Sequence, residues 1–471
     1  MKSESGNIVH FSTDFVQCMF RLSFIVYLCC MTIFHASAQE VWTLEQCIRY
    51  AYDNNIQLKQ QELNVEMDRN NLLQSKLGVL PDLNASANYS SSKGKTLDNT
   101  TFKVIEGVTV NSLSGSVGSS MTLFKGLQQK NTIQQNDYLL KANIENVEKL
   151  KNDLSINIAL YYLQIVHAQE QLAVTQAQLE ITEIQIQRTA HLLDAGKVSE
   201  VDLFDIQSQA AREELQVVNA QNTLDLAKLD LVHLLDLESI DDFQVAVPDF
   251  SNIGIKELGK SVDDVFLSAV TSLPQVKSAE YQLKSAEKSL SVARGYYSPS
   301  LSLSGGYNTR YSSSATLTSQ DANGNPVFTD YPVWDQLKDG INSYIGVGLN
   351  IPIFNKWQAR TGVKNAKLRL MNYQYQLQLV KNTLQKEIQQ SHADAMASFK
   401  KYIASAKTVT STEEAFRTTE QRYEVGIMNF VDYSTAKMRL TTAQSELLQA
   451  KFEYIFKTKI LDFYNGQPIS L

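Results

Sequence analysis

The chain has 471 residues, of which 43% are hydrophobic, 20% charged and 9% aromatic, and its 50 acidic side chains outnumber the 43 basic ones. This length exceeds that of a chain that folds around one ordinary compact core. The acidic balance also argues against a nucleic-acid partner, which usually requires a basic excess. The low numbers of Pro (8) and Gly (20) exclude collagen-like and disordered-linker classes. The mildly negative mean hydropathy excludes a polytopic helical membrane protein, whereas alternating strands of a membrane β-barrel stay compatible with it.

Residues 1–38 are predicted to be a secretory signal peptide. Arg21 supplies its positive end, residues 22–34 its apolar region, and Ala36 and Ala38 the small side chains of a cleavage site after Ala38. The apolar region is shorter than the ~20 residues that span a bilayer. The alternative interpretation is a buried core helix. After cleavage Cys47 is the single thiol, so an internal disulfide is excluded and size or assembly must stabilise the protein.

The sequence contains an internal duplication. A shift of 218 places residues 51–90 on 269–308 without a gap, and it aligns Pro81 with Pro299 and Tyr89 with Tyr307. Further along, a shift of 230 aligns Gly196 with Gly426, and the extra residues fall in a loop around 321–335. We therefore predict a first repeat at 39–238, a linker or equatorial segment at 239–260, a second repeat at 261–465 and a tail at 466–471.

Each repeat is predicted to contain a helix, two strands, a very long helix and a long returning helix. Residues 127–195 and 363–425 contain no Gly or Pro. Helices of this length would reach about 100 Å, several times the width of a globular domain. Several short helices in a bundle are the alternative, but the breakers that they need are missing. Apolar residues recur at steps of three and four along the first long segment, for example at Leu140, Ile144, Val147, Leu150 and Leu154.

The two long helices are predicted to end at glycines and to turn back as antiparallel hairpins. Gly196 and Gly426 suit the left-handed position that follows a helix. Ser199 then precedes Asp202 by three residues, as in a capping box. Asn429 stands in the same relation to Asp432 in the second repeat.

Two pairs of strands are predicted between the helices, with apolar and small polar residues in alternation. Leu301, Leu303 and Tyr307 alternate with serines, and the segments near residues 83–90, 113–123 and 344–353 follow the same pattern. An ordinary soluble sheet is the alternative, but its outer face should carry mixed charges rather than Ser, Gly, Asn and Thr. Four strands cannot close a barrel, which needs ~8 or more. Several chains would therefore have to share one barrel.

These features together resemble the TolC family of outer-membrane efflux and secretion channels, over about residues 40–465. The most specific match is Tyr423-Glu424-Val425-Gly426 followed by Val431-Asp432. The resemblance implies a mainly α fold with β strands, in which long antiparallel helical hairpins form an α-barrel. It also implies that four transmembrane strands per chain contribute to a twelve-stranded barrel shared by a homotrimer. The protein would lie in the outer membrane, extend into the periplasm, and dock a periplasmic adaptor and an inner-membrane pump.

The resemblance also implies a periplasmic entrance closed by the hairpin tips. Asp202 and Asp432 match acidic positions of this entrance, although helix capping is the alternative role for both. Thr435 replaces a second acidic position of the ring, and Met428 replaces an arginine that links neighbouring hairpins in the family. Asp205 shares a helix face with Asp202 and could supply further charge.

We predict no catalytic, cofactor or metal site. The sequence contains no Walker loop, dinucleotide-binding glycine cluster, nucleophile elbow or His-Glu-x-x-His motif. The expected function is therefore a passive channel rather than an enzyme. A periplasmic adaptor protein, which usually has one hairpin, and an exported envelope enzyme are the alternatives. The histidines after the leader are scattered without a second ligand at metal spacing: His167, His191, His233 and His392.

Overall fold

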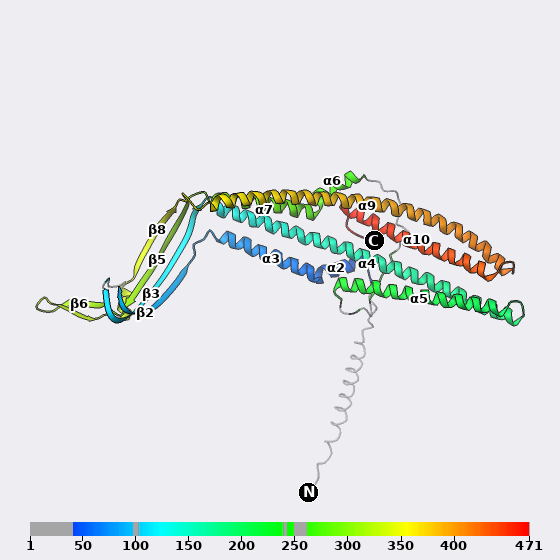
Figure 1. The fold of residues 1–471 in the computed structure, drawn as a ribbon, viewed down its shortest axis with the longest axis horizontal. Helices are drawn as coiled ribbons and strands as arrows, with labels where there is room; N and C mark the ends of the chain where they lie inside the picture. The colour runs from blue at the N-terminus through cyan, green and yellow to red at the C-terminus, as the bar shows by residue number, and fades with distance from the viewer. Residues whose placement is uncertain are drawn as a thin grey trace, which may run out of the picture.

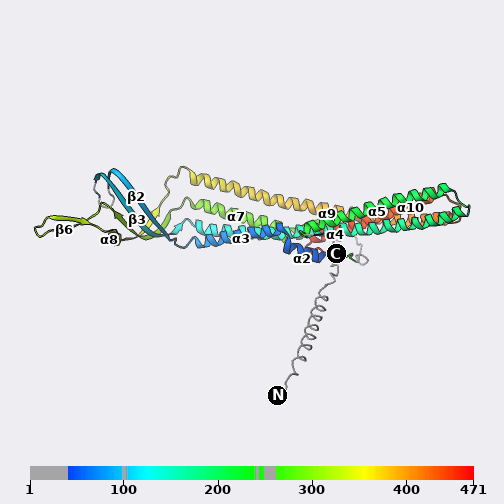
Figure 2. The ribbon, with the colours of Figure 1, turned by 90° about the horizontal axis from the view of Figure 1, so that it is seen from below.

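The computed structural model describes residues 41–97, 102, 104–237, 239, 243–248 and 261–470. Within these residues the molecule is long and narrow, with its strands at one end and two helical hairpins reaching to the other (Figure 1). A second view, turned by 90°, shows the same separation of strands and helices along the long axis (Figure 2). The predicted signal peptide and its cleavage site at Ala38 lie outside the described residues.

The order of elements repeats along the chain, as the duplication predicts. The first half contains β1 (Val41–Trp42), α2 (Leu44–Asn54), α3 (Ile56–Leu77), β2 (Asn84–Leu97), β3 (Val104–Lys125), α4 (Gln128–Asp194), α5 (Glu200–Leu235) and β4 (Gln244–Val245). The second half contains α6 (Val262–Ser272), α7 (Pro274–Gly295), β5 (Ser300–Ser312), β6 (Thr316–Gln320), β7 (Pro326–Asp330), α8 (Val333–Asp339), β8 (Asn342–Asn350), α9 (Gln358–Glu424) and α10 (Phe430–Tyr464). Both long helices, α4 and α9, have 67 residues.

The first helix predicted for each half is in fact two helices. Asn55 interrupts the first one with an extended ψ, and its side-chain oxygen accepts a hydrogen bond from the Leu58 backbone N–H to start α3. In the second half Leu273 is extended because a residue before proline avoids the helical region, and Pro274 then begins α7.

The four long strands form one antiparallel sheet in the order β2-β3-β5-β8, so the strand pairs of the two halves are joined through β3 and β5. The register places apolar side chains of neighbouring strands opposite each other. Val117 of β3 pairs with Ala85 and Tyr307, whereas its neighbour Ser116 pairs with Ser86 and Asn308. The sheet therefore has an apolar face and a face of small polar residues, as the alternation predicts.

The helices form a layer in which two shorter helices follow each other along each long one (Figure 1). Near the strands, α4 lies between α3 and α7, and α7 also contacts α9. Towards the far end, α5 takes the place of α3 beside α4, and α10 takes the place of α7 between α4 and α9. The main core lies near the middle of the layer, where the buried Tyr162 of α4 donates hydrogen bonds to the carbonyls of Trp42 and Ala246 at 3.1 and 2.5 Å.

The extra residues of the second half are more ordered than the loop that the sequence suggests. Strands β6 and β7 pair as a hairpin around Asp321, whose carboxylate accepts 2.8 Å hydrogen bonds from the backbone N–H groups of Asn323 and Asn325. The short helix α8 then packs on β5, where the buried Gln336 side chain binds the Ser312 N–H and the Tyr331 carbonyl.

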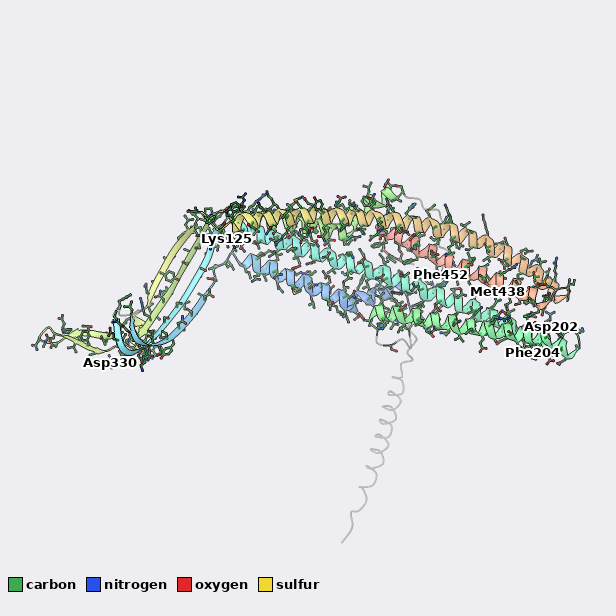
Figure 3. The ribbon with its side chains drawn as sticks, viewed as in Figure 1. Lys125, Asp202, Phe204, Asp330, Met438 and Phe452 are labelled. Carbon is green, nitrogen blue, oxygen red and sulfur yellow. The ribbon has the colours of Figure 1, made fainter. Side chains whose placement is uncertain are left out.

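Figure 3 labels Lys125 at the junction between the sheet and the helices. This junction depends on two glycines in close contact. Gly126 has a positive φ of 56° and connects β3 to α4. A Cβ on Gly295, the last residue of α7, would lie 2.7 Å from the Gly126 carbonyl oxygen and 2.5 Å from Cγ of Gln128. Because the first of these atoms belongs to the backbone, an alanine at 295 would displace the junction.

Gly295→Ala is expected to lower the free energy of unfolding by roughly 1–3 kcal/mol, the usual cost of overpacking. Gly362→Ala is the matched control, because Gly362 lies inside α9 with open space around its Cα. Removing a glycine from a helix interior should stabilise the protein by ~0.5–1 kcal/mol. Thermal unfolding of the purified variants measures both effects, and equal stability of the two would contradict the proposed close contact.

Candidate functional site

The far ends of the two hairpins turn through the same local structure. Gly196 and Gly426 have φ values of 70° and 75°, as predicted for glycines that follow a helix. The next residues, Lys197 and Ile427, donate backbone hydrogen bonds back to Leu192 and Arg422, both at 2.9 Å. These bonds, together with those from the glycines to Leu193 and Tyr423, satisfy carbonyls that the helix ends would leave free.

Asp202 is held at the start of α5 by a capping box. Ser199 accepts a hydrogen bond from the Asp202 N–H, and the Asp202 carboxylate accepts hydrogen bonds from the Ser199 N–H and hydroxyl at 2.9 and 2.7 Å. The hydrogen bond from the Ser199 hydroxyl, with that from its N–H, holds the pKa of Asp202 below its usual range. In the second hairpin Asn429 caps α10 by accepting a 2.8 Å hydrogen bond from the Asp432 N–H. The carboxylate of Asp202 therefore has a capping role, whereas Asp432 contributes only its backbone N–H to the cap of its helix.

The other predicted gate residues lie nearby but differ in exposure. Asp205 and Asp432 are exposed, whereas Met428 is partly buried just after the second turn. The first hairpin instead contacts the second through Arg188 and Glu424, whose side chains are 3.6 Å apart.

An apolar cluster joins the hairpins just behind the turns. Ile206 of the first hairpin is fully buried against Phe430 and Tyr433 of the second. The Tyr423 and Tyr433 rings stack with centroids 4.5 Å apart, and Phe416 packs against Tyr433 at 5.5 Å. Burial raises the pKa of Tyr433 to about 12, so its hydroxyl stays protonated. Figure 3 shows Asp202 and Phe204 close to this end of the molecule and Asp330 at the opposite end.

Beyond the aromatic cluster is a buried charged group that the sequence analysis did not predict. Lys437 of α10 lies 3.4 Å from Glu213 of α5, and both contact Thr182 of α4. A signal for it exists in the sequence, because Lys437 follows Phe430 and Tyr433 at helical spacing on the buried face, and Glu213 follows Ile206 by seven residues. A charged side chain on the buried face of a helix is usually paired, so either residue indicates a buried partner of opposite charge.

No group of three or more His, Cys, Asp or Glu side chains that could hold a metal ion occurs among the described residues. Cys47 is fully buried, and burial raises its pKa to about 12, which leaves the thiol unreactive. His167 is partly buried beside the Phe452 ring, and desolvation lowers its pKa. These groups belong to the core of the helical layer.

In the described part of the chain, no helix combines the length and the apolar character needed to cross a membrane.

Acid is expected to loosen the first turn of α5 through Asp202. Because the folded-state pKa is lowered, the contribution of Asp202 is present above the ordinary carboxyl pKa and is lost as the pH falls through the folded-state pKa. Hydrogen-exchange protection of the α5 first turn should therefore be complete above about pH 5 and should fall as the pH is lowered below about pH 4, the ordinary range of an Asp carboxyl. Asp202→Asn should remove most of this dependence, since the amide does not titrate. An unchanged dependence in the variant would assign the effect to other groups.

Comparison with known proteins gives the family. The outer membrane efflux protein family matches residues 47–236 and 268–456. The chain is 20% identical over 415 residues to the outer membrane efflux protein BepC of Brucella suis biovar 1, covering 88% of this chain and 83% of that protein. It is 24% identical over 435 residues to the outer membrane protein TolC of Escherichia coli, covering 89% and 81%. The fold is similar to crystal structures of CusC, with a TM-score of 0.74, 19% identity and coverage of 90% and 92%. Because the family match spans both halves, the chain belongs to the outer membrane efflux protein family.

Proposed function

We propose that three copies of this outer-membrane protein form a passive exit duct, with one β-barrel in the membrane and one helical barrel in the periplasm. The observation that carries the proposal is the sheet, which is amphipathic and has β2 and β8 as open edges. A bilayer offers no partner for the backbone groups of an open edge, so the edges must pair with other copies. Three copies of the four-stranded sheet give twelve strands.

The helical layer supports the same assembly. Its outermost helices are α3 and α5 on one side and α9 on the other. These edge helices carry rows of exposed apolar residues, which a neighbouring copy would cover. A heterologous contact of one edge with the opposite edge of the next copy closes a ring. The residues of these rows are Leu63, Met67, Leu73 and Leu77 on α3, Leu215, Val218, Leu226 and Leu229 on α5, and Leu368, Met371, Tyr375 and Leu379 on α9.

The proposed partners follow from the family. Proteins of this kind act with a periplasmic adaptor and an inner-membrane pump in tripartite systems. The energy for transport would come from the pump, and this chain would supply the path through the outer membrane without enzymatic activity, cofactor or nucleic-acid partner. Two hairpins per chain and an amphipathic sheet fit this role better than that of an adaptor with one hairpin.

The hairpin ends are the proposed periplasmic entrance. In a ring of three chains, Asp202, Asp205 and Asp432 would repeat around the axis, and like charges held close together favour cations. Gly196 and Gly426 would form the turns at this entrance. Met428 cannot supply the ionic link of an arginine, so Arg188 and Glu424 would provide the contact between hairpins here.

A lysine on each face of β3 tests which side of the sheet meets lipid. Val117→Lys places a charge on the apolar face, where a lysine near the bilayer midplane costs ~2–4 kcal/mol. Ser116→Lys places the same charge one residue away, on the polar face of the sheet. We expect Val117→Lys to reduce assembly in the outer membrane, and Ser116→Lys to assemble and to change the ion selectivity of the pore in planar bilayers. Equal tolerance of both variants would contradict the membrane barrel.

Met428→Arg tests the proposed entrance. The new guanidinium would gain a carboxylate partner at Asp202, and the resting conductance should fall because neighbouring hairpins are joined more firmly. Thr408→Arg is the control, since Thr408 is an exposed residue of α9 far from the second turn. A conductance that stays at the unmodified level in Met428→Arg would remove residue 428 from the entrance.

A further inference from the structure

The most deeply buried ion pair between the two hairpins of the described chain lies behind their tips. Thr182, Glu213 and Lys437 are 3%, 4% and 6% exposed, so their polar groups are almost entirely removed from water. They come from α4, α5 and α10 respectively, which means that Lys437 crosses from the second hairpin to the first. At 1.5 Å per residue, the group lies roughly 10–20 Å from the turns.

The hydrogen bonds of the group form a connected set. The Lys437 ammonium donates to the Gln178 carbonyl at 3.1 Å, to the Thr182 hydroxyl at 2.5 Å and to Glu213 Oε1 at 3.4 Å. The Thr182 hydroxyl donates in turn to Glu213 Oε2. The Gln209 amide donates to Glu213 Oε1 at 2.9 Å. All three donors of the ammonium are therefore used, and all of its partners belong to the first hairpin.

The surrounding interface contains further polar residues at core positions. Thr175, Thr182 and Thr189 are buried on α4 at intervals of seven residues, where a coiled coil would usually place apolar side chains. Gln171 of α4 also donates a 3.0 Å hydrogen bond to Ser445 of α10. Polar residues at such positions fix the register of packed helices at some cost in stability. An interface of this kind can also separate without exposing a large apolar surface.

We propose that Lys437, Glu213 and Thr182 act as a latch that holds the two hairpins of each chain in the resting register and so keeps the periplasmic entrance closed. The proposal rests on the proposed function, since it assigns a gate to the duct. Lys437 is a positioning residue in this account: it sets the place of α10 against α4 and α5, and the residues at the tips close the entrance.

The test compares Lys437→Met with the matched control Lys401→Met. Lys401 forms a 2.8 Å ion pair with Glu453, but that pair is partly exposed and joins α9 to α10 within one hairpin. Resting conductance of the purified protein is measured in planar bilayers without partner proteins. We expect Lys437→Met to raise the open fraction about ten-fold, because Glu213 is left as an unpaired buried charge. Lys401→Met should change it less than ~two-fold, as for other exposed pairs.

A double substitution tests whether the two charges act together. If Glu213 and Lys437 form one unit, the double variant E213Q/K437M should open the channel no more than Lys437→Met alone. Additive effects would contradict a shared latch. Thr182→Val keeps the volume and both charges but removes the linking hydroxyl, and it should produce a smaller rise. This mild variant decides the question if Lys437→Met fails to assemble, and an unchanged conductance in Thr182→Val would then overturn the latch.

A distance measurement separates the latch from the proposed duct. Spin labels at Lys197→Cys and Ile427→Cys, in labelled chains diluted with unlabelled ones, report the separation of the two turns within one chain. The buried Cys47 should not react with the label. Lys437→Met should lengthen or broaden this distance, and Lys401→Met should not. If the unmodified protein forms no pores while the distance changes, the duct fails, and Lys437 sets the position of the hairpins without closing an entrance. If pores form while conductance and distance stay unchanged in Lys437→Met, the latch is wrong.

Discussion

The structure depends on one physical constraint: an amphipathic sheet of four strands cannot close into a barrel by itself. Its apolar face is exposed in the single chain, with Tyr307 and Val347 each about two-thirds uncovered. Lipid can cover such a face, but lipid cannot bond to the free backbone of β2 and β8. When the sheets of several copies join edge to edge in a bilayer, lipid covers the apolar face and the edge strands bond to each other. Gly126 and Gly295 hold the strand-side ends of α4 and α7 close together at the junction with the sheet.

The helical layer contains two kinds of interface with different physical character. The edge helices α3, α5 and α9 present exposed apolar rows, such as that of Leu368, Met371 and Tyr375, which suit a permanent contact between copies. Between the hairpins of one chain, the contact behind the aromatic cluster is polar and centred on Lys437 and Glu213. A polar interface is more specific and easier to separate than an apolar one. In the proposed assembly, the movable boundary would therefore lie inside each chain and the fixed boundary between chains.

Much of the architecture could be predicted from the sequence. The long stretches without Gly or Pro predicted α4 and α9, and the alternating segments predicted the main strands, because both patterns extend over many residues. The breaks at Asn55 and before Pro274 were missed, since one residue interrupts an otherwise continuous helical pattern. The hairpin β6–β7 was missed because its strands have only five residues each. Asp202 and its cap were predicted from their spacing, whereas the contact of Lys437 with Glu213 joins residues far apart in the sequence.

The mass of the native protein, extracted from outer membranes in detergent, tests the central claim most directly. The account predicts a species of three chains, because the proposed barrel takes its twelve strands from three four-stranded sheets and the proposed helical barrel continues it with three helical layers. The measurement should be made on the unmodified protein after correction for bound detergent. A monomer that is recovered in the soluble fraction would contradict the account, because the open strand edges and the exposed apolar face would then have no lipid and no partner to cover them.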